Sequence, residues 1–366
     1  MAEVPRYFPR ARLAELISVV QRAGFRVIGP RVDQGALVYR EIDGVEDLPQ
    51  GLTDEQAPGH YRLAANGTQR HFSWANGMSA IKPFVYAPRE RLWRVDRDTH
   101  GIHFRPLMSI APRTAILGVR ACDLSALILN DAHFLRNLYP DPYYRLRREN
   151  LLLIAVNCSH AASTCFCAST GDGPEVSGGY DLLLNELEEG YLVHSGSPSG
   201  DEILQKLATA RPSRRQLDQA RHQLDACRQQ QRAMPPAPRL TGLMSRLDHP
   251  SWDAVAEQCL ACGNCTAVCP TCFCHREVEA PALDGQSSVH RRDWDSCFNE
   301  DHSYLVGMLV RPDIKTRYRQ WMTHKLATWQ EQYGRSGCVG CGRCTTWCPV
   351  GIDFVAQARR VLEDEA

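Results

Sequence analysis

The first 200 residues alternate between segments of helical period and short apolar runs. Residues 10–22 repeat apolar side chains at the spacing of one helix face, so a helix is predicted there. Because apolar runs and helical segments alternate, we predict a mixed α/β domain whose sheet is at least partly parallel. The predicted strands lie at residues 25–30, 36–42, 114–119 and 151–156 and at two places within 180–194, and a further helix covers 124–135.

The pattern changes near residue 200. Residues 201–234 are polar and helix-prone, and a proline-rich stretch at 235–238 ends them. The residues that follow are compatible with helix almost throughout. We therefore predict three parts: a mixed α/β domain over 1–200, a helical linker over 201–250 that packs on a neighbour, and a helical domain over 251–366.

Composition and charge narrow the class of protein. The chain has 366 residues, of which 43% are hydrophobic and 23% charged, and these values exclude a disordered or fibrous protein. Lys+Arg and Asp+Glu are 42 each, so the net charge is zero, and no nucleic-acid partner is expected. Among the cations only four are lysines, which we interpret as a bias of composition.

Sixteen cysteines are the unusual feature of the composition. They are too few in 366 residues for a disulfide scaffold, and the first residues lack the apolar core of a signal peptide. The longest apolar run, at 151–156, is too short to span a bilayer. We therefore expect a cytoplasmic protein without membrane insertion, whose cysteines are reduced and serve mainly as metal ligands.

Half of the cysteines lie in an internal repeat. Residues 259–270 and 338–349 both read Cys-x2-Cys-x2-Cys-x3-Cys-Pro and are identical at seven of twelve positions. This run is the [4Fe–4S] signature of two-cluster ferredoxins, in which the fourth cysteine ligates the other cluster. Gly263 and Gly342 allow the backbone to approach the sulfides. The predicted ligand sets are Cys259, Cys262, Cys265 and Cys348 for one [4Fe–4S] cluster, and Cys338, Cys341, Cys344 and Cys269 for the other.

Structural zinc is the alternative use of the repeat. Zinc sites favour two separated Cys-x2-Cys pairs, whereas here three thiols share seven residues in each copy. The chain would then be a zinc-stabilised interaction module. Iron–sulfur ligation is the favoured interpretation. Because 68 residues with helix-like content separate Cys269 from Cys338, the helical kind of two-cluster ferredoxin domain fits better than the compact kind.

The other eight cysteines carry weaker signals. Four in the α/β part follow predicted strand ends or lie in a glycine-containing loop, and they either hold a third [4Fe–4S] cluster or are inert buried thiols. Three flank the first motif, and their role as metal ligands is left open; Cys227 has no predicted role. The four are Cys122, Cys158, Cys165 and Cys167, and the three are Cys272, Cys274 and Cys297.

Further motifs surround the cysteines between residues 58 and 355. They are PGHYRL at 58–63, GVRACDL at 118–124, VNC at 156–158, TCFC at 164–167, CPTCFC at 269–274, WDSC at 294–297 and GID at 351–353. In these motifs the chain resembles the iron–sulfur β subunit of soluble NAD(P)-linked [NiFe] hydrogenases (sulfhydrogenases). It is similar in the same segments to a related component of anaerobic sulfite reductase. One departure is Ala121, where the family would have proline before the cysteine.

The resemblance implies a protein that carries electrons within a larger complex and performs no bond chemistry, so no catalytic residues are expected. Its partners would be a flavin subunit that handles NAD(P)H and either the small and large subunits of a hydrogenase or the catalytic subunit of a sulfite reductase. The sequence itself contains no recognisable nucleotide-binding motif, in agreement with such a role. We expect a one-electron relay through two [4Fe–4S] clusters, with a third as the open alternative described above.

Overall fold

A seven-stranded sheet forms the centre of the N-terminal part of the chain, and the computed structural model describes residues 5–108 and 110–363. In spatial order its strands are β1 (Arg6–Pro9), β11 (Gly190–Ser195), β10 (Leu182–Glu186), β9 (Leu151–Val156), β8 (Thr114–Val119), β2 (Arg26–Asp33) and β3 (Ala36–Glu41). The four strands from β10 to β2 pair in parallel, and the outer strands pair antiparallel. The predicted mixed sheet is therefore confirmed.

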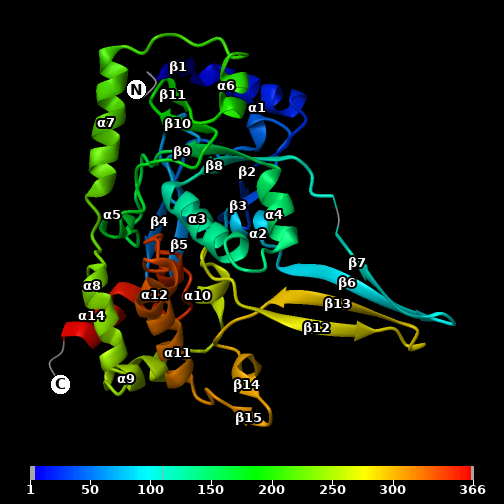
Figure 1. Cartoon of the computed structure of the whole chain (residues 1–366). Coiled ribbons are helices and arrows are strands. Elements are labelled where there is room, and N and C mark those ends of the chain that lie inside the picture. The colour runs from blue at the N-terminus through cyan, green and yellow to red at the C-terminus, as the bar shows by residue number, and fades with distance from the viewer. Residues whose placement is uncertain (1–4, 109, 364–366) are drawn as a thin grey trace.

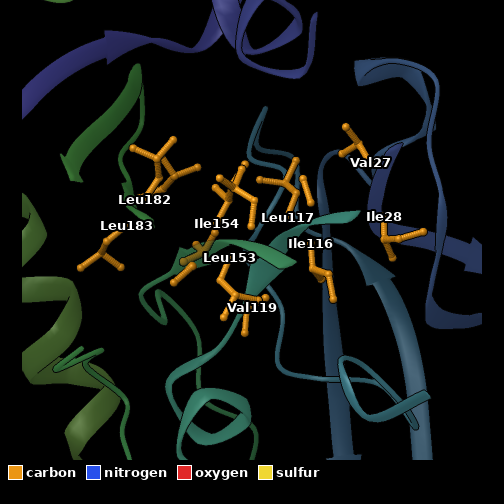
Figure 2. Packing of buried hydrophobic residues seen from close by; sticks show 14 of the residues in the cluster. Val27, Ile28, Ile116, Leu117, Val119, Leu153, Ile154, Leu182 and Leu183 are labelled. Carbon is orange, nitrogen blue, oxygen red and sulfur yellow. The ribbon is translucent and has the colours of Figure 1, made fainter. Parts of the chain in front are cut away.

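The composition of strands β8 and β9 explains why they lie at the centre of the sheet. β8 and β9 are almost wholly apolar and buried, as strands covered on both faces must be. Figure 2 shows Ile116 and Leu117 of β8 close to Leu153 and Ile154 of β9 in the core. The helices of this part are α1 (Leu13–Arg22), α2 (Lys82–Val85), α3 (Ala121–Leu135), α4 (Pro142–Glu149), α5 (Cys167–Thr170) and α6 (Pro198–Leu204). Because α3 begins directly after β8, its first turn lies at the carboxyl edge of the parallel strands.

The predicted linker contains one long helix, α7 (Arg214–Arg228), followed by α8 (Ala237–Leu240). Ser213 begins α7 with a capping box, in which its hydroxyl accepts from the backbone of Gln216 and the Gln216 side chain accepts in return. The apolar side of α7 packs against Leu187 and Leu192, beside the edge of the large sheet. Figure 1 shows α7 standing along that edge and leading down to α8.

The C-terminal part has its own hydrophobic core, built around Trp252, Phe298, Trp321 and Phe354. Short helices surround this core, and a π-helical turn at His324–Thr328 joins two of them. The helices are α9 (Ser251–Gln258), α10 (Asn264–Ala267), α11 (Ile314–Thr323), α12 (Trp329–Tyr333), α13 (Arg343–Thr346) and α14 (Phe354–Glu363). The overall fold class, a mixed α/β part followed by a smaller C-terminal part, agrees with the prediction.

The expected helical content between the two cysteine motifs is wrong for residues 275–294. These residues form β12 (His275–Pro281) and β13 (Ser287–Trp294) in a four-stranded sheet ordered β12-β13-β6-β7. The partner strands β6 (Arg89–Asp98) and β7 (Gly101–Pro106) come from the N-terminal part. Because the pairing joins segments almost 200 residues apart, no local sequence pattern predicts it. Figure 1 shows this sheet as an arm that extends away from the body of the protein.

The remaining elements are small. β4 (Leu52–Ala57) and β5 (His60–Ala65) form a hairpin, and β14 (Tyr304–Leu305) pairs with β15 (Met308–Leu309). Short 3-10 turns lie at Arg10–Arg12, Val45–Asp47, Thr241–Ser245 and Glu300–Ser303. Within the described ranges, no helix has both the length and the apolar character needed to cross a membrane.

Candidate iron–sulfur sites

The two copies of the cysteine repeat adopt the same backbone conformation. In the first copy Ala261 and Gly263 have φ angles of 51° and 71°, and in the second Gly340 and Gly342 have 64° and 74°. These left-handed residues curl the chain between the cysteines, and a short helix, α10 or α13, begins directly afterwards. The repeat in sequence is therefore a repeat in structure.

The first predicted ligand set lines one cavity. Cys259, Cys262, Cys265 and Cys348 are all on its wall. The backbone N–H of Ala261 donates to the Cys259 sulfur at 3.4 Å, and that of Ile352 donates to the Cys348 sulfur at 3.3 Å. Hydrogen bonds of this kind tune a cluster by stabilising charge on its sulfurs. The rest of the wall is mostly apolar and includes Phe298, Tyr318, Trp321, Ile352 and Phe354.

The second predicted set lines a neighbouring cavity. Cys338, Cys341 and Cys344 share its wall with Cys269, the fourth cysteine of the first motif. The structure thus groups three cysteines of each motif with the last cysteine of the other motif, as the crossed arrangement requires. That these cysteines ligate iron stays a prediction. The walls of both cavities include Cys344, Trp321 and Phe354, so the two sites are adjacent.

The chemistry of these cavities fits a four-iron cluster. Burial raises the pKa of Cys265 and Cys344 well above the ordinary value, so as free thiols they would stay neutral, whereas bound iron would hold them as thiolates. Among the described residues, the Tyr318 hydroxyl and the Trp321 indole N–H are buried on the first cavity's wall without a hydrogen-bond partner. Within residues 5–108 and 110–363, no three His, Cys, Asp or Glu side chains lie close enough to hold a single metal ion.

A buried lysine accompanies the second set. Lys325 is 5% exposed, and its ammonium donates to the Thr271 hydroxyl at 2.8 Å, which in turn lies 3.2 Å from the Cys269 sulfur. Burial alone would lower the pKa of Lys325, but the neighbouring Cys269 and Cys272 raise it above the ordinary value. A hydrogen bond with Cys272, helped by Lys325, lowers the pKa of Cys269 well below that of a free thiol. No sequence motif pointed to this lysine.

The second motif is also one of the places where the C-terminal part meets the α/β part. A Cβ on Gly340 would lie 2.5 Å from the Cα of Cys167, so only glycine fits against this backbone. The Phe166 N–H donates to the Gly340 carbonyl at 2.8 Å. Arg343 and Asp123, each 1% exposed, form an ion pair at 2.9 Å. The second site is therefore held from both sides of the junction.

The four cysteines of the α/β part gather at this junction. Cys122 lies in the first turn of α3, Cys158 follows the end of β9, Cys165 precedes α5, and Cys167 is the first residue of α5. Cys165 interacts with Cys167 and Cys158, and Cys122 interacts with Cys341 and Cys167. Burial raises the pKa of all four, to about 12 for Cys167. The structure therefore brings this predicted set to one place, beside the second motif.

The linker helix reaches the same place, which the sequence did not indicate. Cys227, near the end of α7, is 4% exposed and interacts with Cys158. Gln230 donates from its amide to the Cys167 sulfur at 3.3 Å. The only signal available in the sequence was that Cys227 falls on the apolar side of a polar helix.

Cys272, Cys274 and Cys297 form another group, at the base of the arm. Cys274 precedes β12 and Cys297 follows β13, and their thiols are near neighbours. The interaction with Cys297 is the main cause of the lowered pKa of Cys274, about 4, with a further contribution from His302. Sequence reasoning left the role of these three cysteines open and missed His302, which no motif marks.

Comparison with known proteins found two similarities. Residues 258–352 match the family described as "4Fe-4S dicluster domain", which supports [4Fe–4S] clusters as the cofactors of the C-terminal part. The whole chain is similar to Sulfhydrogenase 2 subunit beta of Pyrococcus furiosus, with 27% identity over 368 residues that cover 98% of this chain and 96% of the relative. The resemblance predicted from the motifs is confirmed along nearly the whole chain. No solved structure matches the chain.

Proposed function

We propose that the chain is the electron-transfer subunit of a cytoplasmic hydrogenase complex, without catalytic residues of its own. It relays electrons through [4Fe–4S] clusters between a flavin subunit that binds NAD(P)H and the small and large subunits of a [NiFe] hydrogenase. The observation that carries this proposal is the pair of adjacent cavities, each lined by three cysteines of one motif together with the last cysteine of the other, with Cys344 on both walls. The similarity to Sulfhydrogenase 2 subunit beta favours the hydrogenase complex over a sulfite reductase.

The two cavities suit a relay because little separates them. Cys344 and Trp321 belong to both walls, so clusters bound there would lie side by side with mainly apolar side chains around them. Exclusion of water and hydrogen bonds to sulfur are the factors by which a protein sets cluster potentials. Cys262 in the first site is exposed, which supports the first cluster as the point of exchange with a partner.

The third cluster, with Cys122, Cys158, Cys165 and Cys167 as ligands, is part of the same proposal. Its support is the place of these thiols at the domain junction, where Cys122 and Cys167 both interact with Cys341 of the second site. Electrons would then pass from the first site to the second and on into the α/β part. All sixteen cysteines are free of disulfide bonds, as this use requires.

Iron and acid-labile sulfide in the anaerobically purified protein test the cluster assignment. Cys262→Ser and Cys341→Ser should each lower the iron content by about four atoms per chain, the content of one cubane. Cys227→Ser is the matched control and should leave the iron unchanged. About two zinc ions per chain without sulfide would refute the proposal and support the zinc-stabilised module.

The third cluster is tested separately. Cys165→Ser should lower the iron content by about four atoms per chain while both ferredoxin-type clusters keep their EPR signals. Unchanged iron in this variant would mean that the cysteines of the α/β part are inert thiols and that the relay ends at the second site.

The choice of complex is tested by its catalytic subunits. The chain should co-purify with a nickel-containing subunit and with a flavin subunit. Siroheme in the purified complex would instead establish the sulfite reductase alternative.

A further inference from the structure

Three cysteines outside the ferredoxin motifs are brought together by the base of the arm. The register of β12 and β13 pairs His275 with Trp294, so Cys274, just before β12, comes close to the residues just after β13. The backbone N–H of Asp295 donates to the Cys274 carbonyl at 2.9 Å, which fixes the two chain segments side by side. Cys297 is two residues further on.

The side chains at this place form a set of four soft donors. The thiol of Cys274 lies near the thiol of Cys297 and the imidazole of His302, and both neighbours lower its pKa. Cys272 interacts with both of these thiols. Three thiols and one imidazole are ligands that iron–sulfur clusters use, and in Rieske centres histidine replaces cysteine in this way.

His302 is held in the manner of a metal ligand. Its Nδ1 lies 2.6 Å from a carboxylate oxygen of Asp295, whose side chain is 5% exposed. A carboxylate behind a histidine fixes the orientation of the ring and leaves Nε2 available for a metal. Asn299 donates to the other oxygen of Asp295, so the carboxylate is itself held in place.

A buried cation lies against the same group. Lys82 is 6% exposed, and its ammonium donates to the backbone carbonyls of Ala267 and Cys272 at 3.2 and 3.3 Å. The same ammonium lies 3.9 Å from the centre of the Trp294 ring. A buried charge is costly unless an opposite charge compensates it, and a cluster with thiolate ligands supplies such a charge. Lys82 and Lys325 are two of the four lysines in the chain, and both lie beside candidate cluster sites.

We propose that Cys272, Cys274, Cys297 and His302 hold a further iron–sulfur cluster, at the base of the arm. The inference rests on the proposed relay, because Cys272 interacts electrostatically with Cys269 of the second site and Cys297 with Cys265 of the first. The cluster would form a branch beside both ferredoxin-type sites. Its histidine ligand gives it a higher reduction potential than an all-cysteine cluster of the same type.

The test compares full-length variants reconstituted anaerobically with iron and sulfide. Cys297→Ser and Cys272→Ser should each lose about two or four irons per chain, the content of a [2Fe–2S] or [4Fe–4S] core, together with equal sulfide. Cys227→Ser, which changes a buried thiol of the linker helix α7, is the matched control and should lose none. The EPR signals of the two ferredoxin-type clusters should remain in all three variants, which shows that the protein has folded.

His302→Cys gives a readout that a structural role would not change. This variant should keep the full iron content, and the potential of one cluster should move to a lower value because a thiolate replaces the imidazole. A potential that does not move overturns the histidine ligand.

Two results would overturn the site as a whole. One is full iron content in both Cys297→Ser and Cys272→Ser, and the other is loss of one zinc ion per chain instead of iron and sulfide. If Cys262→Ser also keeps all its iron, the proposed relay fails; if Cys262→Ser loses iron and the arm variants do not, only this inference fails.

Discussion

The buried ion pair between Asp123 and Arg343 connects the first turn of α3 to the second cysteine motif, and Arg343→Met tests its contribution. Each side chain is 1% exposed, and the pair is 2.9 Å apart. Asp123 also accepts from the Asn76 amide, and Arg343 donates to the Gly77 carbonyl at 3.1 Å. Methionine fills a similar volume but leaves the carboxylate buried without its partner charge. Loss of one member of a buried pair costs about 3–5 kcal/mol, a large part of a typical stability of about 5–15 kcal/mol.

Anaerobic urea denaturation of the reconstituted protein measures this effect, with circular dichroism and cluster absorbance followed together. Arg221→Met is the control, because its pair with Asp218 is 70% and 42% exposed. The loss in the control should not exceed about 1 kcal/mol. The double variant Asp123→Leu/Arg343→Met removes both charges and should recover part of the loss. If Arg343→Met costs no more than the control, the junction does not depend on this pair, contrary to the prediction.

Other residues of the candidate sites allow three more tests. Lys325→Met should lower the reduction potential of the second cluster, because a buried positive charge stabilises the more negative reduced state. Lys325→Arg keeps the charge and should retain the potential. An EPR-monitored redox titration measures the potential in both variants. Gly340→Ala should abolish stable folding around the second cluster, because the added Cβ would meet the Cys167 backbone. The control Gly334→Ala has a similar φ of 71° but open space around it, so it should lower the free energy of unfolding by only about 1–2 kcal/mol. Burial, with a smaller contribution from a nearby histidine, lowers the pKa of His133 to about 4, so this imidazole takes up a proton on unfolding. The unfolding free energy should therefore fall as pH drops below about 6.5, and His133→Gln should flatten that slope in denaturation curves at several pH values.

The parts of the fold that could be predicted are those specified by local sequence. The strands at residues 114–119 and 151–156 end where expected, because a short run that is mostly or wholly apolar is placed in a core. β12 and β13 could not be predicted, because their residues are mostly polar and half-exposed. Their stability comes from pairing with β6, which is distant in the chain, and with each other.

The same distinction applies to the candidate sites. The spacing of each repeat predicted three cysteines of each cavity, because a cubane imposes that spacing on one short segment, and the known ferredoxin pattern supplied the fourth; Cys344 on the first cavity's wall was not predicted. Lys82 contacts residues more than 180 positions away, and no motif marks it. The one available signal was the scarcity of lysine: two of the four lysines are buried beside candidate ligands, which a bias of composition does not explain.

The contact with the α/β part explains why the second cysteine repeat tolerates fewer residue types than the first. Where the first copy has Ala261, the second has Gly340, and both adopt a positive φ. Alanine is tolerated in the first copy because Ala261 is partly exposed, whereas Gly340 packs directly against the backbone at Cys167. Gly342 is restricted in the same way by the Thr164 carbonyl, 2.3 Å from its ideal Cβ. One short segment therefore wraps the second candidate cluster and docks the α/β part at the same time. A change at Gly340 or Gly342 would therefore disturb the second candidate cluster and the contact with the α/β part together.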